Sequence, residues 1–285
     1  MNKIYSLIYI VSIFACIGCN NTHDIKNEIN KENNNLGDWE LKQKVTKQID
    51  SLVFIFPREG YAFERRNSLV NECMEAIAQN LKLTEIKEFT APYRIEFFRS
   101  KAAMKEAKGM GVSGYNDYWR REVNFVSTND PETVKKENII PAPITHEFLH
   151  TVAMETWGVP PNNNNWLNEG LATYAANRCN GLCVAEIYSF LFTEGITFPM
   201  DSLVNNFYRQ DEMIAYHQSA YIVQSLIEFQ GIEKIKELWQ AGFIDFEKIY
   251  GIPYSEMESK INNSIMDKYP TSIVIDWETF KKGCK

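Results

Sequence analysis

The most constraining feature of this sequence is the string HEFLH at 146–150, in a chain that has only four histidines. On an α-helix, residues four apart lie on the same face, one turn above the other. His146 and His150 can therefore reach one ion together, whereas Glu147 is rotated by about 100° around the helix axis. This pattern is typical of zinc hydrolases, and it predicts a helix over 144–157. The alternative is a helix whose histidines face a polar groove or solvent.

A catalytic zinc ion has three protein ligands and one open position, so a third ligand is needed. The string WLNEGLATY at 166–174 has helical spacing and offers Glu169. The preceding residues 158–165 have the composition of a loop, which would let the two helices face one another. Gly170 would permit close packing against another helix. On spacing alone, Glu169 could equally be a surface acid near a helix start, where acids are favoured.

HEFLH, eighteen further residues and then the glutamate of WLNEGLATY resemble the gluzincin metallopeptidases. The NEG string after a tryptophan is especially similar to the alanyl-aminopeptidase branch and to peptidase MA-like bacterial proteins. The resemblance, which covers roughly 90–270, implies an α+β, thermolysin-like zincin domain. In that fold a small mixed-sheet lobe precedes a mostly helical lobe, and the zinc helix lies between them. It also implies one Zn²⁺ held by His146, His150 and Glu169, with Glu147 as general base on a zinc-bound water.

The resemblance also implies a partner for the oxyanion that forms when a peptide bond is attacked. A hydrogen-bond donor at that place is worth on the order of 3 kcal/mol. The stretch 213–226 offers Tyr216, His217 and Tyr221. Tyr216 matches the family's tyrosine best, because it stands just before the Ser-x-Tyr that opens a long helix. The alternative is that all three pack the core or cap that helix.

The substrate expected from the resemblance is a peptide or protein. Aminopeptidases of the family carry a Gly-x-Met-Glu-Asn motif for the substrate's free amine, and this chain has no such string. We therefore expect an endopeptidase, with an aminopeptidase as the second alternative. The main alternative is a surface lipoprotein that binds protein or glycan on this scaffold with weak or no catalysis. Substrate would add as a strand to an edge strand at 121–127, and Asn168 and Thr173 are candidates for orienting the histidines.

The beginning of the chain predicts a secreted, anchored protein. Residues 1–19 hold one lysine and then an apolar run that ends at Cys19, the shape of a secretory signal. This end resembles a bacterial lipoprotein signal, in which Cys19 becomes the acylated N-terminus, although Cys16 stands where an aliphatic residue is usual. Residues 20–39 are polar and asparagine-rich, which predicts a disordered tether. We expect a lipid-anchored protein of the bacterial envelope; a signal cut elsewhere or an uncleaved anchor is the alternative.

Length and charge limit the remaining possibilities. The 285 residues suffice for one sizeable domain or two small ones. A net charge of −7 without a block of lysine and arginine argues against a nucleic-acid partner. Beyond the tether, residue patterns predict a mixed α/β lobe over 40–139, a helical catalytic lobe over 140–270 and a C-terminal tail over 271–285.

Apolar periodicity predicts the individual elements. Strands are expected at 92–98 and 121–127, where β-branched and aromatic residues gather. Helices are expected at 38–56, 65–82, 101–111, 144–157, 166–177, 184–194, 213–230, 232–241 and 254–268.

Four cysteines lie beyond the signal, where an oxidising envelope would favour disulfides. The string CNGLC brings Cys179 and Cys183 close enough for a local disulfide, with an Asn-Gly turn between them. Cys73 and Cys284 could then pair and hold the tail. Four cysteines allow three pairings, and buried free thiols are the alternative.

Overall fold

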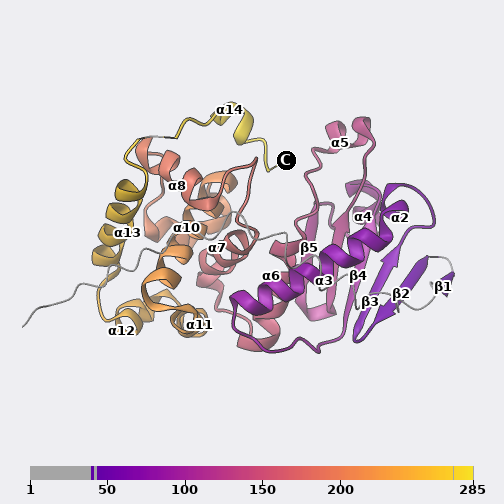
Figure 1. Ribbon diagram of the computed structural model, residues 1–285, viewed down its shortest axis with the longest axis horizontal. Helices are drawn as coiled ribbons and strands as arrows, with labels where there is room; N and C mark the ends of the chain where they lie inside the picture. The colour runs from indigo at the N-terminus through magenta and orange to yellow at the C-terminus, as the bar shows by residue number, and fades with distance from the viewer. Residues whose placement is uncertain (1–39, 42–43, 272, 285) are drawn as a thin grey trace, which may run out of the picture. The chain divides into compact units, whose positions relative to one another are not determined.

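The protein is an α+β protein, described by a computed structural model over residues 40–41, 44–271 and 273–284. These residues group as one compact unit. The predicted signal and tether, 1–39, lie outside the described residues. Figure 1 shows the strands gathered in the earlier part of this unit and helices making up the later part. Nowhere in the described ranges is a helix long and apolar enough to cross a membrane.

A six-stranded mixed sheet forms the first part of the described chain, in the order β1-β2-β3-β4-β6-β5. The pairs β3–β4 and β4–β6 are parallel, and the other neighbours are antiparallel. The strands are β1 (Glu40–Leu41), β2 (Val45–Ile49), β3 (Leu52–Phe56), β4 (Tyr93–Phe98), β5 (Gly114–Asp117) and β6 (Glu122–Val126).

The helix predicted over 38–56 is wrong, because the described residues of this segment form β1, β2 and β3. Asp50, with φ of 49°, lies in the tight turn between β2 and β3. Phe54 and Phe56 are fully buried, and the run LVFIF is rich in the β-branched and aromatic residues that fit a pleated, half-buried surface. Their apolar spacing also fits a helix, so periodicity alone misassigned the segment.

Helices cover both faces of this sheet. Alternate residues of a strand point to opposite faces. Ile95 therefore packs with Leu69 and Cys73 of the helix on one face, and Phe98 packs with Met104 of the helix on the other. These helices are α3 (Arg66–Leu83), preceded by the single turn α2 (Tyr61–Glu64), and α4 (Lys101–Lys108). The predicted strands at 92–98 and 121–127 and helices at 65–82 and 101–111 are confirmed.

The open edge of the sheet differs from the prediction. β6 was expected at the edge, but it lies between β4 and β5, and β5 is the outer strand on this side of the sheet. The four residues of β5, GYND, are all only half-buried. Such a short polar strand lacks the β-branched and aromatic run by which strands are recognised. β1 and β5 are therefore the two outer strands of the described sheet.

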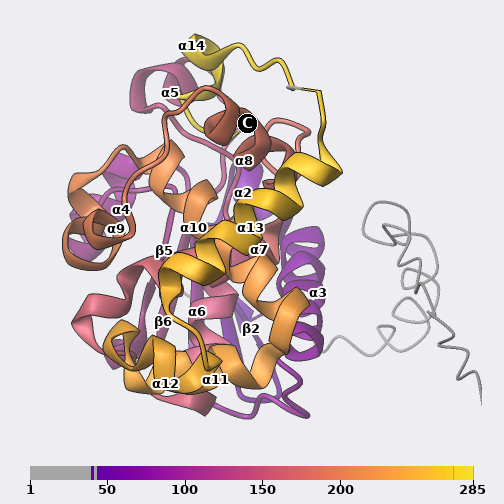
Figure 2. The ribbon, with the colours of Figure 1, turned by 90° about the vertical axis from the view of Figure 1, so that its left-hand side faces the viewer.

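The second part of the chain is helical. Its helix α10 lies among α7, α8 and α11, which pack against it (Figure 2). All six helices predicted from 144 onward are confirmed, whereas the short α5, α9, α12 and α14 were not predicted. The helices are α5 (Pro131–Glu137), α6 (Ile144–Trp157), α7 (Asn165–Ala176), α8 (Val184–Thr193), α9 (Met200–Asn206), α10 (Glu212–Gln230), α11 (Ile232–Ala241), α12 (Phe246–Tyr250), α13 (Tyr254–Lys268) and α14 (Trp277–Phe280). Short 3₁₀ turns are η2 (Tyr118–Arg120), η3 (Asn162–Asn164), η4 (Phe207–Arg209) and η5 (Phe243–Asp245).

Helix α6 joins the two parts, because it contributes to both hydrophobic cores. Its Phe148 is fully buried in the core of the sheet with Phe125. The next residue, Leu149, is fully buried in the core of the helical part. A helix buried on two opposite faces is held rigidly, so side chains on its remaining face have fixed positions.

The packing role predicted for Gly170 is confirmed. A Cβ atom on this residue of α7 would lie 2.8 Å from the backbone carbon and oxygen of Ser219 on α10. That is closer than real Cβ contacts, and backbone atoms within a packed helix cannot move aside easily. Gly170 therefore sets how closely α7 approaches α10.

We expect Gly170→Ala to destabilise the protein by roughly 1–3 kcal/mol, because the added methyl group overpacks this contact. Urea unfolding of the variant and the wild type measures the difference. Ala176→Ser, at the exposed end of the same helix, is the matched control and should stay within about 0.5 kcal/mol. Equal midpoints for the two variants would contradict the close approach.

The disulfide joins Cys179 to Cys284, so the predicted pairs Cys179–Cys183 and Cys73–Cys284 are both wrong. Cys73 is a buried free thiol in the core of the sheet, and Cys183 is a half-buried free thiol. The bond ties the C-terminal tail to the loop before α8.

Local backbone geometry explains why the near neighbour does not pair. Cys179 and Leu182 exchange two backbone hydrogen bonds of 2.9 and 3.0 Å, which close a tight turn with Asn180 and Gly181 at positive φ. The chain leaves this turn directly into α8, and the Sγ of Cys183 lies 4.0 Å from the hydroxyl of Tyr269 instead.

His217 of α10 is buried under the tail, with 3% of its surface exposed. Its Nδ1 donates a hydrogen bond to the carbonyl oxygen of Met213 at 2.7 Å, and its ring lies 5.5 Å from that of Phe280. Burial disfavours the charged imidazolium and lowers the pKa of His217 from 6.5 to about 4.

This burial predicts an acid-sensitive contribution to stability. Below pH 6.5 the unfolded His217 takes up a proton, whereas the folded residue stays neutral until about pH 4. The free energy of unfolding should therefore fall as the pH drops through this window, by roughly 3 kcal/mol in total. His217→Gln cannot titrate, and urea unfolding of both proteins across the window should show a shallower pH dependence for the variant. Parallel curves would contradict a neutral, buried His217.

Candidate metal centre

The two predicted helices face one another, and their polar residues meet. His146 and His150 lie one turn apart on α6, and Glu169 lies on α7, which packs against α6. Between the helices, the buried Asn164 donates from Nδ2 to the carbonyl oxygens of Leu238 and Trp239, at 2.8 and 3.2 Å. These bonds hold the connecting loop on α11, so that α7 starts at a defined position.

The three donor atoms form a compact triangle. His146 Nε2 lies 3.1 Å from His150 Nε2 and 3.1 Å from Glu169 Oε2, and His150 Nε2 lies 3.4 Å from the same oxygen. Ligands held at about 2.0–2.1 Å on a tetrahedral zinc ion lie about 3.3 Å from one another. The structure thus brings together three residues whose nitrogen, nitrogen and oxygen donors fit one zinc ion.

The hydrogen bonding of His150 leaves the correct nitrogen free. Oδ1 of Asn168, on α7, accepts a hydrogen bond from His150 Nδ1 at 2.8 Å. When the ring is neutral, as a metal ligand must be, this bond places its proton on Nδ1 and leaves the lone pair of Nε2 for the triangle. Thr173, the other residue considered for this task, has a buried hydroxyl without a hydrogen-bond partner among the described residues.

The charges of His146, His150 and Glu169 act strongly on one another. Burial by itself would lower the pKa of His150, but the negative charge and hydrogen bond of Glu169 raise it to about 9. Burial would likewise raise the pKa of Glu169, but the two histidines lower it well below its usual range. A buried carboxylate of this kind requires a positive partner, and a divalent cation would supply one.

Glu147 lies beside the triangle with 8% of its surface exposed. Burial raises the pKa of its carboxyl group, against the opposing effect of the two neighbouring histidines and of the Asn116 backbone amide. The side chain of Asn116, on β5, donates to the hydroxyl of Thr151, which itself donates to the Glu147 carbonyl oxygen at 3.0 Å. The outer strand β5 is therefore tied to α6 beside Glu147.

Of the three aromatic candidates on α10, Tyr216 lies at the triangle. Its ring stacks on that of His146 with 6.2 Å between centroids, and its hydroxyl makes no hydrogen bond to any described residue. Burial, together with the charge of Glu169, raises its pKa, so the hydroxyl keeps its proton. His217 lies at the disulfide instead, and Tyr221 stacks on Tyr188 at 4.5 Å.

Tyr208 is a further residue of this centre, which the sequence patterns did not single out. Its hydroxyl donates to Oε1 of Glu169 at 2.9 Å, the oxygen that does not face the histidines. Tyr208 lies in the turn η4 and is 63% exposed. No periodicity or motif connects such a turn residue to a helix almost forty positions earlier, so no sequence signal could have indicated this contact.

Comparisons with known proteins give little further guidance. No protein-family model matches the chain, and no curated protein matches it. One solved structure that is similar is an aminopeptidase N family protein from Idiomarina loihiensis, at 14% identity and a TM-score of 0.40. The likeness covers 86% of this chain and 46% of that one, so the chain spans less than half of that protein's length. At this distance the likeness carries no argument about activity.

We expect Asn168→Ala to weaken zinc binding about 10- to 100-fold, because His150 loses the bond that fixes its tautomer and orientation. Competition against a chromophoric chelator measures the dissociation constant. Thr173→Ala, on the same helix, is the matched control and should bind zinc like the wild type. If both variants lose affinity equally, the role assigned to Asn168 is incorrect.

Proposed function

We propose that this chain is a zinc-dependent metallopeptidase that acts as an endopeptidase. The observation that carries the proposal is the triangle of His146, His150 and Glu169 donors with the buried carboxylate of Glu147 beside it. A zinc ion bound there would supply Lewis acidity, which lowers the pKa of water and polarises a carbonyl group.

The residues of the chain would then perform the proton transfers. Glu147 would accept a proton from the attacking water and pass it to the leaving amine, as general base and then general acid. Tyr216 would donate a hydrogen bond from its hydroxyl group to the developing oxyanion.

The position of β5 supports a peptide as the substrate. This strand is one of the two outer strands of the described sheet, and its Asn116 lies at Glu147. An extended peptide that paired with β5 by β-augmentation would run past the carboxylate with its main chain. Main-chain pairing does not require a free N-terminus. Together with the absence of a Gly-x-Met-Glu-Asn string, this favours internal cleavage over removal of terminal residues.

We also propose that the enzyme is anchored to a bacterial envelope membrane by lipid on Cys19. The support is the sequence of 1–19 alone, since this segment lies outside the described residues. Labelling with a fatty-acid probe in cells, abolished by Cys19→Ala, tests this anchor. Equal labelling of the two proteins would contradict it.

The Glu147→Gln variant should bind zinc like the wild type. Its rate of cleavage of an unfolded protein substrate should be lower by about 100-fold or more, because the glutamine amide cannot accept the proton of the attacking water. Zinc content and cleavage are measured on the same samples, with a chelated wild-type sample as a further control. A wild type that holds zinc and cleaves nothing across a broad peptide library would contradict the proposal and favour a binding protein. Cleavage only of peptides with a free N-terminus would indicate an aminopeptidase.

Tyr216→Phe should lower kcat by about 100- to 1,000-fold, which corresponds to one lost oxyanion donor. Its zinc affinity should remain unchanged, since the hydroxyl contacts no ligand. Tyr221→Phe, one turn further along α10 and stacked on Tyr188, is the matched control and should keep its activity. A larger loss for Tyr221→Phe than for Tyr216→Phe would exclude the assigned role.

A further inference from the structure

The C-terminal tail is docked by packing that does not involve its disulfide. Phe280 of α14 is 3% exposed and lies against His217. Trp277, one turn earlier, lies 5.9 Å from the ring of Phe190 on α8. Burial of these two aromatic side chains favours the docked position in either redox state.

A hydrogen bond next to the disulfide holds its two sides together. The side chain of Asn180 donates to the carbonyl oxygen of Gly283 at 3.2 Å. These residues directly follow Cys179 and precede Cys284, whose Cα atoms lie 4.7 Å apart. Breaking the sulfur–sulfur bond would therefore leave two thiols side by side.

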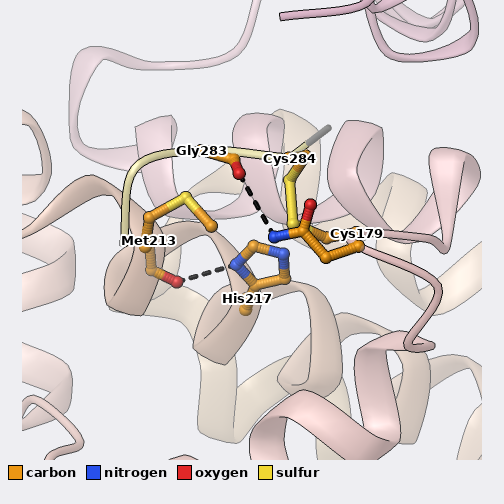
Figure 3. The surroundings of a disulfide bond; sticks show 6 residues. Cys179, Met213, His217, Gly283 and Cys284 are labelled. Carbon is orange, nitrogen blue, oxygen red and sulfur yellow. Dashed lines mark hydrogen bonds between the residues drawn. A yellow bond between two sulfur atoms is a disulfide. The ribbon is translucent and has the colours of Figure 1, made fainter. Parts of the chain in front are cut away.

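A third donor faces the same place. Figure 3 shows the imidazole of His217 beside Cys179, with Nδ1 turned toward Met213. Nε2 of His217 makes no hydrogen bond to any described residue. One ring nitrogen and the two sulfur atoms of Cys179 and Cys284 lie within 4.8 Å of one another. A histidine that donates Nδ1–H to a backbone carbonyl has the arrangement common among metal ligands.

We propose that reduction of the Cys179–Cys284 disulfide creates a Cys₂His site, made of Cys179, Cys284 and His217, for Zn²⁺ or a similar borderline divalent cation. A dithiol reductant is oxidised to its own disulfide, and its two hydrogens pass to the two cysteine sulfurs. As the cation binds, each thiol releases a proton and ligates as thiolate, and His217 ligates as neutral imidazole. Solvent would supply the fourth ligand, because Cys284 is only half-buried.

The surroundings suit such a site better than a site with hard oxygen ligands. Cys179 and His217 lie among buried apolar side chains, which include Ile187 and Leu191. Two thiolates cancel the double positive charge of the cation, so the complete site carries no net charge into this apolar environment. Either the disulfide or the cation would then hold the tail across the 105-residue separation.

Cobalt titration tests the proposal, because thiolate ligands give Co²⁺ a near-ultraviolet charge-transfer band that nitrogen and oxygen ligands do not. The full chain carries Cys16→Ser and Cys19→Ser to remove thiols outside the described residues. It is titrated with Co²⁺ alone, first as oxidised protein and then after reduction by a water-soluble phosphine, which is itself oxidised to its oxide. We expect reduction to add one equivalent of bound Co²⁺ together with the thiolate band.

Variants separate this site from the other candidates. Cys284→Ser should abolish the thiolate band, and His217→Gln should lower the cobalt affinity of the reduced protein about tenfold or more. Cys183→Ser should leave both unchanged. A reduced protein without the added equivalent and the band would overturn the proposal, as would a band that depends on Cys183 and not on Cys284. The triangle of His146, His150 and Glu169 contains no sulfur, so Co²⁺ bound there gives no thiolate band. If the proposed enzyme site were absent, the oxidised protein would bind no Co²⁺, whereas the test on the reduced cysteines would be unaffected.

Discussion

The close approach of α7 to α6 and α10 is the constraint on which the rest of the structure depends. Glu169 must enter a space between two imidazoles where its charge is almost fully desolvated, and such a charge is tolerated only with partners at hydrogen-bond distance. Gly170, the next residue, allows α7 to lie against the backbone of α10. A side chain there would move the carboxylate away from the histidines, although it would touch neither of them.

The centre draws on both parts of the fold, which explains why α6 is buried on two faces. The sheet contributes Asn116, whose backbone amide acts on Glu147, and α10 contributes Tyr216, which stacks on His146. Helix α6 lies between the sheet and α10 and fixes the positions of these residues relative to one another. The disulfide and the docked tail contact the next residue of α10, His217, whose side chain is rotated by about 100° from that of Tyr216. Helix α10 therefore contacts both the candidate metal centre and the Cys179–Cys284 disulfide that holds the C-terminal tail.

The sequence predicted the parts of the structure that depend on local periodicity and missed those that depend on distant partners. Helices such as 144–157 follow from repeated apolar spacing, and the meeting of Glu169 with the histidines follows from a family resemblance. The prediction of a helix over 38–56 was wrong because the apolar spacing of this segment suits a helix and a hairpin alike. Only pairing with neighbouring strands determines which of the two forms. The disulfide partner of Cys179 was predicted wrongly, and the contact of Tyr208 with Glu169 was not predicted, because each is made with a residue far away in the sequence.

X-ray absorption at the zinc edge of the oxidised, zinc-loaded protein tests the central claim most directly. The account predicts one zinc ion whose nearest shell holds only nitrogen and oxygen at roughly 2.0–2.1 Å, with the outer scattering of two imidazole rings. Both imidazole signals should weaken when His146 and His150 are replaced. A shell containing sulfur, or a spectrum unchanged by those replacements, would contradict the account.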